Sequence, residues 1–146
     1  MQHSESITIQ CPLGEVWAMA GDPHAWGKWI KGITDVKSEE SGTLAAGKAL
    51  SFAERGKARN MTVIEYEAGR IIRLGSTQKG YDFNETIALV ESAGATEVTL
   101  TMGLEPTVWW ASFLALFMQP INGLVIGRPL RKTLQALSAA LESQAE

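Results

Sequence analysis

The stretch that decides the fold lies near the C-terminus, where residues 108–127 read VWWASFLALFMQPINGLVIG without one charged side chain. After Arg128 the chain becomes amphipathic, with leucines recurring at the spacing of one helical face. These leucines are Leu130, Leu134, Leu137 and Leu141. A segment this apolar has to be covered by a sheet, a second subunit or a membrane. The rest of the sequence shows whether this chain contains a sheet that could cover it.

The apolar run has the length of a membrane-spanning helix, but its composition favours a buried helix. Pro120 removes a backbone hydrogen bond and Pro129 does the same further on, so each is expected to kink or break the helix. We therefore predict two segments, roughly Val108–Met118 and Pro120–Ser143, bent at Pro120 and again near Arg128.

The N-terminal part predicts one strand followed by two short helices. Ser6–Gln10 alternates apolar and polar residues, as a strand with one buried face does. Pro12–Ala20 then reads as a short helix. Asp22 is a plausible N-cap for a second short helix, which carries Trp26 and Trp29 on one side.

Residues 32–104 predict strands joined by short turns that contain glycine. The expected strands are Ile33–Ser38, Lys48–Glu54, Arg59–Glu67, Ile71–Thr77, Tyr81–Val90 and Thr96–Leu104. Short turns of this kind join antiparallel neighbours, so these strands form a meander. Alternation gives the sheet one apolar face, and the C-terminal helix is the element able to cover it.

Composition excludes several classes of function. The chain has 146 residues, a net charge of −3 and scattered Lys and Arg, so we expect no nucleic-acid partner. Its single cysteine, Cys11, fits a reducing compartment, and we expect a cytoplasmic protein. With His3 and His24 as the only histidines, no zinc or iron spacing is present. No glycine-rich phosphate loop is present either, so we expect neither a metal nor another cofactor.

Several features together resemble the polyketide cyclase/dehydrase branch of the START-like (SRPBCC) superfamily, which includes the major birch-pollen allergen. The features, in chain order, are Pro12 with Val16-Trp17, the series Asp22, Trp26 and Trp29, then Gly47, Gly94 with Thr96, and finally Arg131, Leu134, Leu137 and Leu141-Glu142. The resemblance covers nearly the whole chain.

This resemblance implies an α+β helix-grip fold in one domain, residues 1–146. In that fold a curved seven-stranded antiparallel sheet wraps around a long C-terminal helix, and two short helices follow the first strand. It also implies a cavity between sheet and helix. Members of the superfamily mostly bind apolar or amphipathic small molecules such as lipids, polyketides and quinones, and some are cyclases or aromatases.

Glu85 is the main candidate for acid–base chemistry, with Tyr81 or Tyr66 as its partner. It is in register with Phe83 and Ile87 on an apolar strand face. If that face lines a cavity, burial raises the pKa of Glu85 and suits it to act as a general acid or base. In the other arrangement Glu85 reaches water or pairs with an arginine, and we favour this second arrangement.

Candidate ligand contacts come from the residues that can approach the space between sheet and helix. They are Trp29, Phe52, Tyr66, Tyr81, Phe83, Glu85, Met102, Leu104, Trp109, Phe113 and Phe117. An apolar concave site with a few polar groups is typical of a ligand pocket. The alternative is a fully packed core without a cavity. Arg73 opposes Ile72 and Leu74 in its strand, so we expect it to face solvent.

Three functions remain open from the sequence. We favour the binding of an apolar or amphipathic small molecule without a cofactor. The alternative is a cofactor-independent cyclase or aromatase that uses Glu85 and a tyrosine. The third is an interaction module, because the helix over residues 108–126 has apolar side chains all round. This surplus favours a homodimer first and peripheral membrane contact second.

Overall fold

The computed structural model describes residues 2–38, 44–78, 81–106 and 129–142. Its elements, in order, are strand β1 (Gln2–Ile9), helix α1 (Leu13–Ala20), 3₁₀-helix η1 (Pro23–Lys28), and strands β2 (Ile33–Ser38), β3 (Ala49–Glu54), β4 (Lys57–Glu67), β5 (Ile71–Gln78), β6 (Tyr81–Ser92) and β7 (Ala95–Pro106). Residues 129–142 then form a helix, here called the C-terminal helix. This order confirms the predicted sequence of elements.

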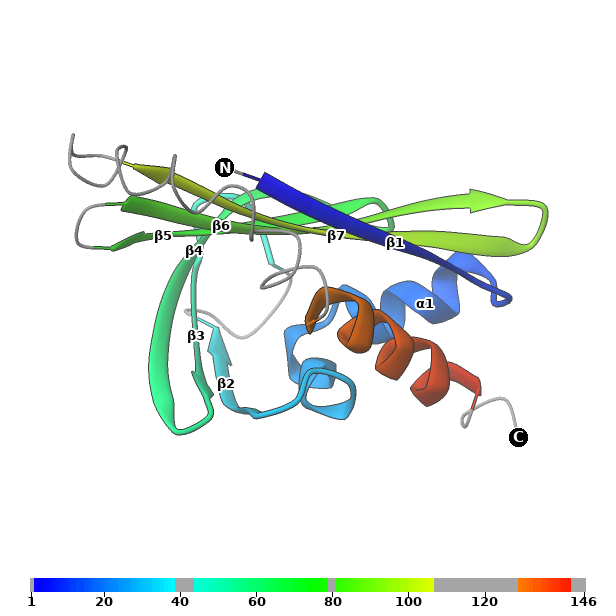
Figure 1. The fold of residues 1–146 in the computed structure, drawn as a ribbon, viewed down its shortest axis with the longest axis horizontal. Helices are drawn as coiled ribbons and strands as arrows, with labels where there is room; N and C mark the ends of the chain where they lie inside the picture. The colour runs from blue at the N-terminus through cyan, green and yellow to red at the C-terminus, as the bar shows by residue number, and fades with distance from the viewer. Residues whose placement is uncertain (1, 39–43, 79–80, 107–128, 143–146) are drawn as a thin grey trace.

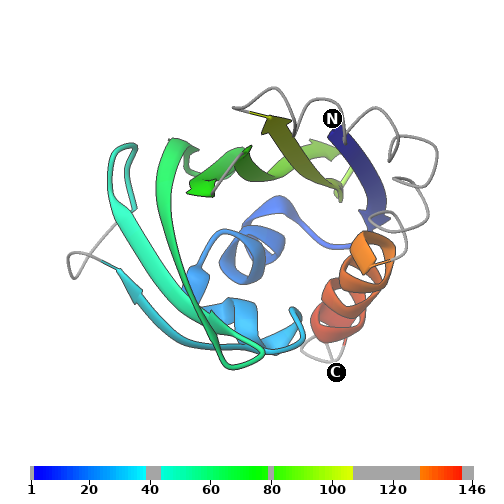
Figure 2. The ribbon, with the colours of Figure 1, turned by 60° about the vertical axis from the view of Figure 1, so that its left-hand side comes forward.

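All seven strands form one antiparallel sheet in the order β1-β7-β6-β5-β4-β3-β2. Strands β2 to β7 make the predicted meander, and β1 joins it beside β7, the last strand among the described residues. The sheet curves around α1, η1 and the C-terminal helix (Figures 1 and 2). The α+β helix-grip architecture expected from the resemblance is therefore observed.

The C-terminal helix packs on the sheet through its leucine stripe. Leu130, Leu134, Leu137 and Leu141 are all buried in the core cluster. Arg131, on the exposed side of this helix, places a guanidinium nitrogen 3.3 Å from the carboxylate of Glu5 in β1. The predicted role of these leucines is confirmed. The predicted segment Val108–Met118 and the bend at Pro120 lie outside the described residues.

Two tryptophans join η1 to the end of α1. The indole N–H of Trp26 donates to the carbonyl of Ala20 at 2.8 Å, and that of Trp29 donates to the carbonyl of Met19 at 3.0 Å. The last carbonyls of a helix have no partner within the helix, so these bonds satisfy them. Asp22 caps η1 as predicted, accepting from the backbone N–H of His24 at 3.0 Å.

The first strand begins earlier than the sequence indicates. We predicted Ser6–Gln10, but β1 starts at Gln2 and ends at Ile9. Pairing with β7 determines this start, because residues 2–5 face residues 100–103 in register. On the outer face Ser4 bonds to Thr101 and Ser6 to Thr99, both at 2.7 Å. Polar cross-strand pairs therefore extend a strand that apolar alternation alone makes too short.

Two hairpins have the turn geometry that a two-residue connection requires. Arg55 and Gly56 join β3 to β4 with φ of 52° and 81°, and Ala93 and Gly94 join β6 to β7 with φ of 53° and 80°. Positive φ at both central residues fits a type I′ turn, which matches the twist of the strands. These turns fix the register of β3 and β6, the strands that supply the carboxyl groups discussed below.

Within the described residues no helix combines the length and apolarity needed to cross a bilayer. The segment for which we predicted dimerisation, residues 108–126, lies outside this part of the chain. The predictions of a homodimer and of membrane contact therefore stay predictions.

Candidate functional site

A small pocket lies on the concave face of the sheet, under η1. Four residues of β5 and β6 form its floor. Leu74 pairs with Glu85 and Ile72 pairs with Ile87, so the four side chains make one square patch. Side chains two positions apart share a face of a strand, and the register aligns the two pairs across neighbouring strands. Three members of this floor are apolar, and Glu85 is the fourth.

Aromatic and branched residues form the walls. The full set of lining residues is Trp26, Ile30, Ile33, Phe52, Glu54, Ile72, Leu74, Glu85 and Ile87. The indole of Trp26 meets the ring of Phe52 edge-on, with centroids 6.2 Å apart and an interplanar angle of 86°. The cavity volume is about 60 Å³. That is room for a few water molecules or one small group, so a larger molecule would extend past the mouth.

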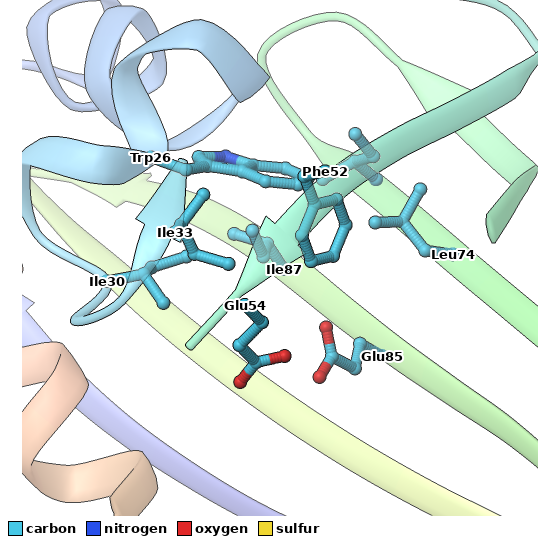
Figure 3. Close-up of a pocket in the computed structure, with 9 residues that line it drawn as sticks. Trp26, Ile30, Ile33, Phe52, Glu54, Leu74, Glu85 and Ile87 are labelled. Carbon is cyan, nitrogen blue, oxygen red and sulfur yellow. The ribbon is translucent and has the colours of Figure 1, made fainter. Parts of the chain in front are cut away.

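Two carboxyl groups meet at one end of this pocket. Glu54 ends β3, and Glu85 lies within β6. Their carboxyl groups point toward each other, and most of the apolar lining residues lie away from this end of the pocket (Figure 3). Strands β4 and β5 separate β3 from β6 in the sheet, so curvature of the sheet brings the two groups together. The pocket thus has an apolar interior and an acidic mouth.

The environment of Glu85 changes its protonation. Burial, and to a smaller extent the nearby carboxylate of Glu54, raises the pKa of Glu85 to about 7, while the guanidinium of Arg59 acts in the opposite direction. A buried carboxyl loses the hydration that favours its charged form, and a like charge disfavours that form again. Near neutral pH a carboxyl of this kind can both give and accept a proton.

Arg59 is the basic group of this site. Its Nε lies 3.7 Å from a carboxylate oxygen of Glu54, and the two side chains are 47% and 39% exposed. A single long contact between exposed groups contributes little stability. Within the described residues the side chain of Glu85 makes no hydrogen bond or ion pair. Every fully buried side-chain oxygen or nitrogen among these residues has a hydrogen-bond partner, so the unpartnered oxygens of Glu85 are not fully buried. The Glu85 oxygens are therefore accessible from the pocket.

Only some of the predicted contacts reach this pocket. Phe52 and Glu85 line it. Glu85 lies beside apolar side chains in the pocket, as in the first of the two arrangements left open by the sequence. Arg73 does face solvent, 43% exposed and 3.4 Å from Glu65.

The other predicted contacts lie elsewhere. Trp29 is buried and bonds to α1, while Phe83 and Met102 are half-buried against the core. Tyr66 packs on Trp17 with ring centroids 6.0 Å apart, and Tyr81 is 39% exposed. Leu104 is half-buried, one strand away from the pocket floor. Trp109, Phe113 and Phe117 lie outside the described residues.

Of the nine lining residues, sequence reasoning missed seven, among them Glu54 and Trp26. The signal for Glu54 was present, because Leu50, Phe52 and Glu54 occupy alternate positions of one strand and so share its inner face. Trp26 lies in η1, but Trp29 follows the end of this helix at Lys28, so the prediction that one helix carries both tryptophans holds only for Trp26. Sequence spacing alone does not show which of the two indoles contacts Phe52.

The match to a family model covers almost all of the chain. The model is described as polyketide cyclase/dehydrase and lipid transport, and it matches residues 2–142. The chain belongs to this family. No curated protein is similar in sequence at a level that supports homology. Membership of the family fits both binding and cyclase chemistry and leaves the substrate open.

Solved structures show the same fold at low sequence identity. A protein from Thermus thermophilus aligns with a TM-score of 0.68 at 12% identity, with 100% of both chains covered. Norcoclaurine synthase from Thalictrum flavum aligns with a TM-score of 0.68 at 11% sequence identity, and the alignment covers 100% of this chain and 96% of the synthase chain. The di-domain ARO/CYC protein BexL aligns with a TM-score of 0.69 at 17% sequence identity, and the alignment covers 97% of this chain and 46% of BexL. At these identities the likeness concerns the fold alone.

Proposed function

We propose that the protein binds a small apolar or amphipathic molecule, of a lipid, polyketide or quinone-like type, in the pocket under η1. The observation that carries this proposal is an apolar cavity with a pair of carboxyl groups at one end. An apolar body would displace water from the floor, and a polar end would meet Glu54 and Glu85. The family description, which includes lipid transport, supports the same class of activity.

Protein-detected NMR with small apolar fragments tests this proposal. We expect binding to move the indole N–H signal of Trp26, which lines the pocket, and to leave that of Trp17, which packs on Tyr66 instead. Ile87→Trp should fill the cavity and weaken binding by at least about tenfold, because the fragment loses its space. Circular dichroism establishes that this variant is folded.

The matched control is Val90→Trp, which adds the same ring to an exposed position of the same strand. This variant should bind fragments like the unchanged protein. If no apolar fragment moves the Trp26 signal, or if Ile87→Trp binds as well as Val90→Trp, the pocket is not the binding site.

A second candidate is cofactor-independent acid–base catalysis of the cyclase or aromatase type. The observation that favours it is the pKa of Glu85, about 7, in an apolar pocket. Neither Tyr81 nor Tyr66 lines this pocket, so the second polar group in this version is Glu54. A general base of this pKa suits removal of a proton from carbon next to a carbonyl group at neutral pH.

Deuterium exchange into pentane-2,4-dione, a small 1,3-dicarbonyl compound, tests this second candidate. The protein should accelerate exchange at the central carbon, and Glu85→Gln should remove about a hundredfold or more of that acceleration. Glu97→Gln, at an exposed position of β7, serves as the control. Equal exchange rates for the Glu85→Gln variant and the unchanged protein would exclude Glu85 as the base.

A further inference from the structure

We propose that the ligand of this pocket is an amine, whose apolar body lies on the floor and whose ammonium group sits between Glu54 and Glu85. This inference rests on the proposed binding function and names its ligand class. The juxtaposition that carries it is two facing carboxyl groups at the end of an apolar cavity (Figure 3).

The two carboxyl groups leave a position for a cation. They come from strands that are not neighbours in the sheet and converge on one point at the pocket mouth. An ammonium group there has three N–H donors, enough to bond to both carboxylates at once. Such charge-assisted bonds are shorter and stronger than those between neutral groups.

The charge at the mouth is unbalanced among the described residues. Glu54 and Glu85 face each other, and the carboxylate of Glu54 disfavours the charged form of Glu85. Arg59 offsets this only in part, because it is 47% exposed and meets Glu54 through one contact of 3.7 Å. No described side chain forms an ion pair with Glu85. A bound ammonium would supply the missing positive charge next to the more buried of the two groups.

Other ligand classes fit the mouth less well. An anionic group would be repelled by both carboxylates. A neutral carbonyl group would need the protonated form of Glu85 or the exposed guanidinium of Arg59 as its donor, and it would leave the carboxylate of Glu54 unused. Magnesium and calcium ions need about six or more oxygen ligands. Within the described residues no cluster of three or more Asp, Glu, His or Cys side chains is present to begin such a site.

Three compounds that share one ring test the amine directly: benzylamine is a cation, benzyl alcohol is neutral and benzoate is an anion. Titrations followed by the Trp26 indole signal, at about pH 8 and so above the pKa of Glu85, give the dissociation constants. We expect benzylamine to bind about tenfold more tightly than benzyl alcohol, and benzoate to bind most weakly. Magnesium chloride should not displace benzylamine at matched ionic strength.

Single substitutions then assign the effect to the carboxyl pair. Glu54→Gln and Glu85→Gln should each weaken benzylamine binding about tenfold and weaken benzyl alcohol binding by a clearly smaller factor, since each removes one charge and little volume. Glu97→Gln should change neither ligand. Glu54 is 39% exposed at the end of its strand, so its variant should fold even if that of Glu85 does not.

The outcomes separate this inference from the proposed function. If benzyl alcohol or benzoate binds as tightly as benzylamine, the proposal that the ligand is an amine is wrong, and the pocket remains a binding site. The proposal of an amine is also wrong if neither Gln variant weakens the binding of benzylamine, or if magnesium displaces benzylamine competitively. If none of the three compounds moves the Trp26 signal, neither the amine nor the binding of small aromatic ligands in this pocket stands.

Discussion

Leu137→Ala is expected to lower the free energy of unfolding by about 3 kcal/mol, the largest loss we predict for a single side chain. Leu137 has 0% of its surface exposed and lies in the core cluster between the C-terminal helix and the sheet. The substitution removes buried carbon atoms and leaves a cavity that the surrounding side chains fill only in part. Urea unfolding followed by circular dichroism measures the effect as a lower transition midpoint.

The matched control for this substitution is Gln135→Ala in the same helix. Gln135 is exposed, so its replacement by another good helix former should change the free energy of unfolding by less than about 0.5 kcal/mol. A loss below about 1 kcal/mol for Leu137→Ala would show that the C-terminal helix does not pack in the core as the structure describes it.

Glu85→Gln is expected to stabilise the protein above neutral pH and to have little effect in acid. The pKa of Glu85 is raised from 4.5 to about 7 in the fold. Between these values the folded chain keeps a proton that the unfolded chain has lost, so stability falls as pH rises. Above the folded pKa both states are ionised and the full penalty of roughly 3 kcal/mol applies. Below the unfolded pKa both states are protonated and the penalty vanishes.

The measurement is the difference in the free energy of unfolding between Glu85→Gln and the unchanged protein across this pH range. Taking the difference removes the contribution of all other titrating groups. This difference should grow in favour of the variant from near zero at about pH 4.5 to a plateau of roughly 3 kcal/mol above about pH 7. Gln135→Ala, which removes no titrating group, should give a nearly flat difference. A flat difference for Glu85→Gln would mean that Glu85 is solvated in the fold.

The architecture of this chain follows from patterns that are local in sequence. Period-two alternation between short glycine turns defined the meander, and the leucine stripe of residues 130–141 defined the helix that covers it. Both patterns arise from burial, which the sequence records directly. The start of β1 was harder to predict, because His3 and Ser4 are polar and their strand conformation depends on pairing with β7.

The site was only partly predictable, because curvature decides which residues meet. Alternation showed that Glu85 shares a face with Ile87, but it does not measure how far β6 bends toward β3. Alternation places Glu54 on the inner face of β3, but its proximity to Glu85 could not be read from spacing, and a charge at the end of a strand is usually solvated. Irregular backbone adds to this difficulty. The register shifts between Thr34 and Lys37 and again between Val63 and Glu65, and no sequence pattern indicated either shift.

The pairing of β1 with β7 has a consequence for the newly made chain. Ser4 and Thr101, whose hydroxyl groups bond across these strands, are 97 positions apart. At a synthesis rate of about 5–20 residues per second, β1 waits roughly 5–20 s for its partner to be made. During that time Ile7, Ile9 and the unpaired backbone of the strand are open to chaperones or to another chain. The sheet is thus completed only after β7, the distant partner of β1, has been made.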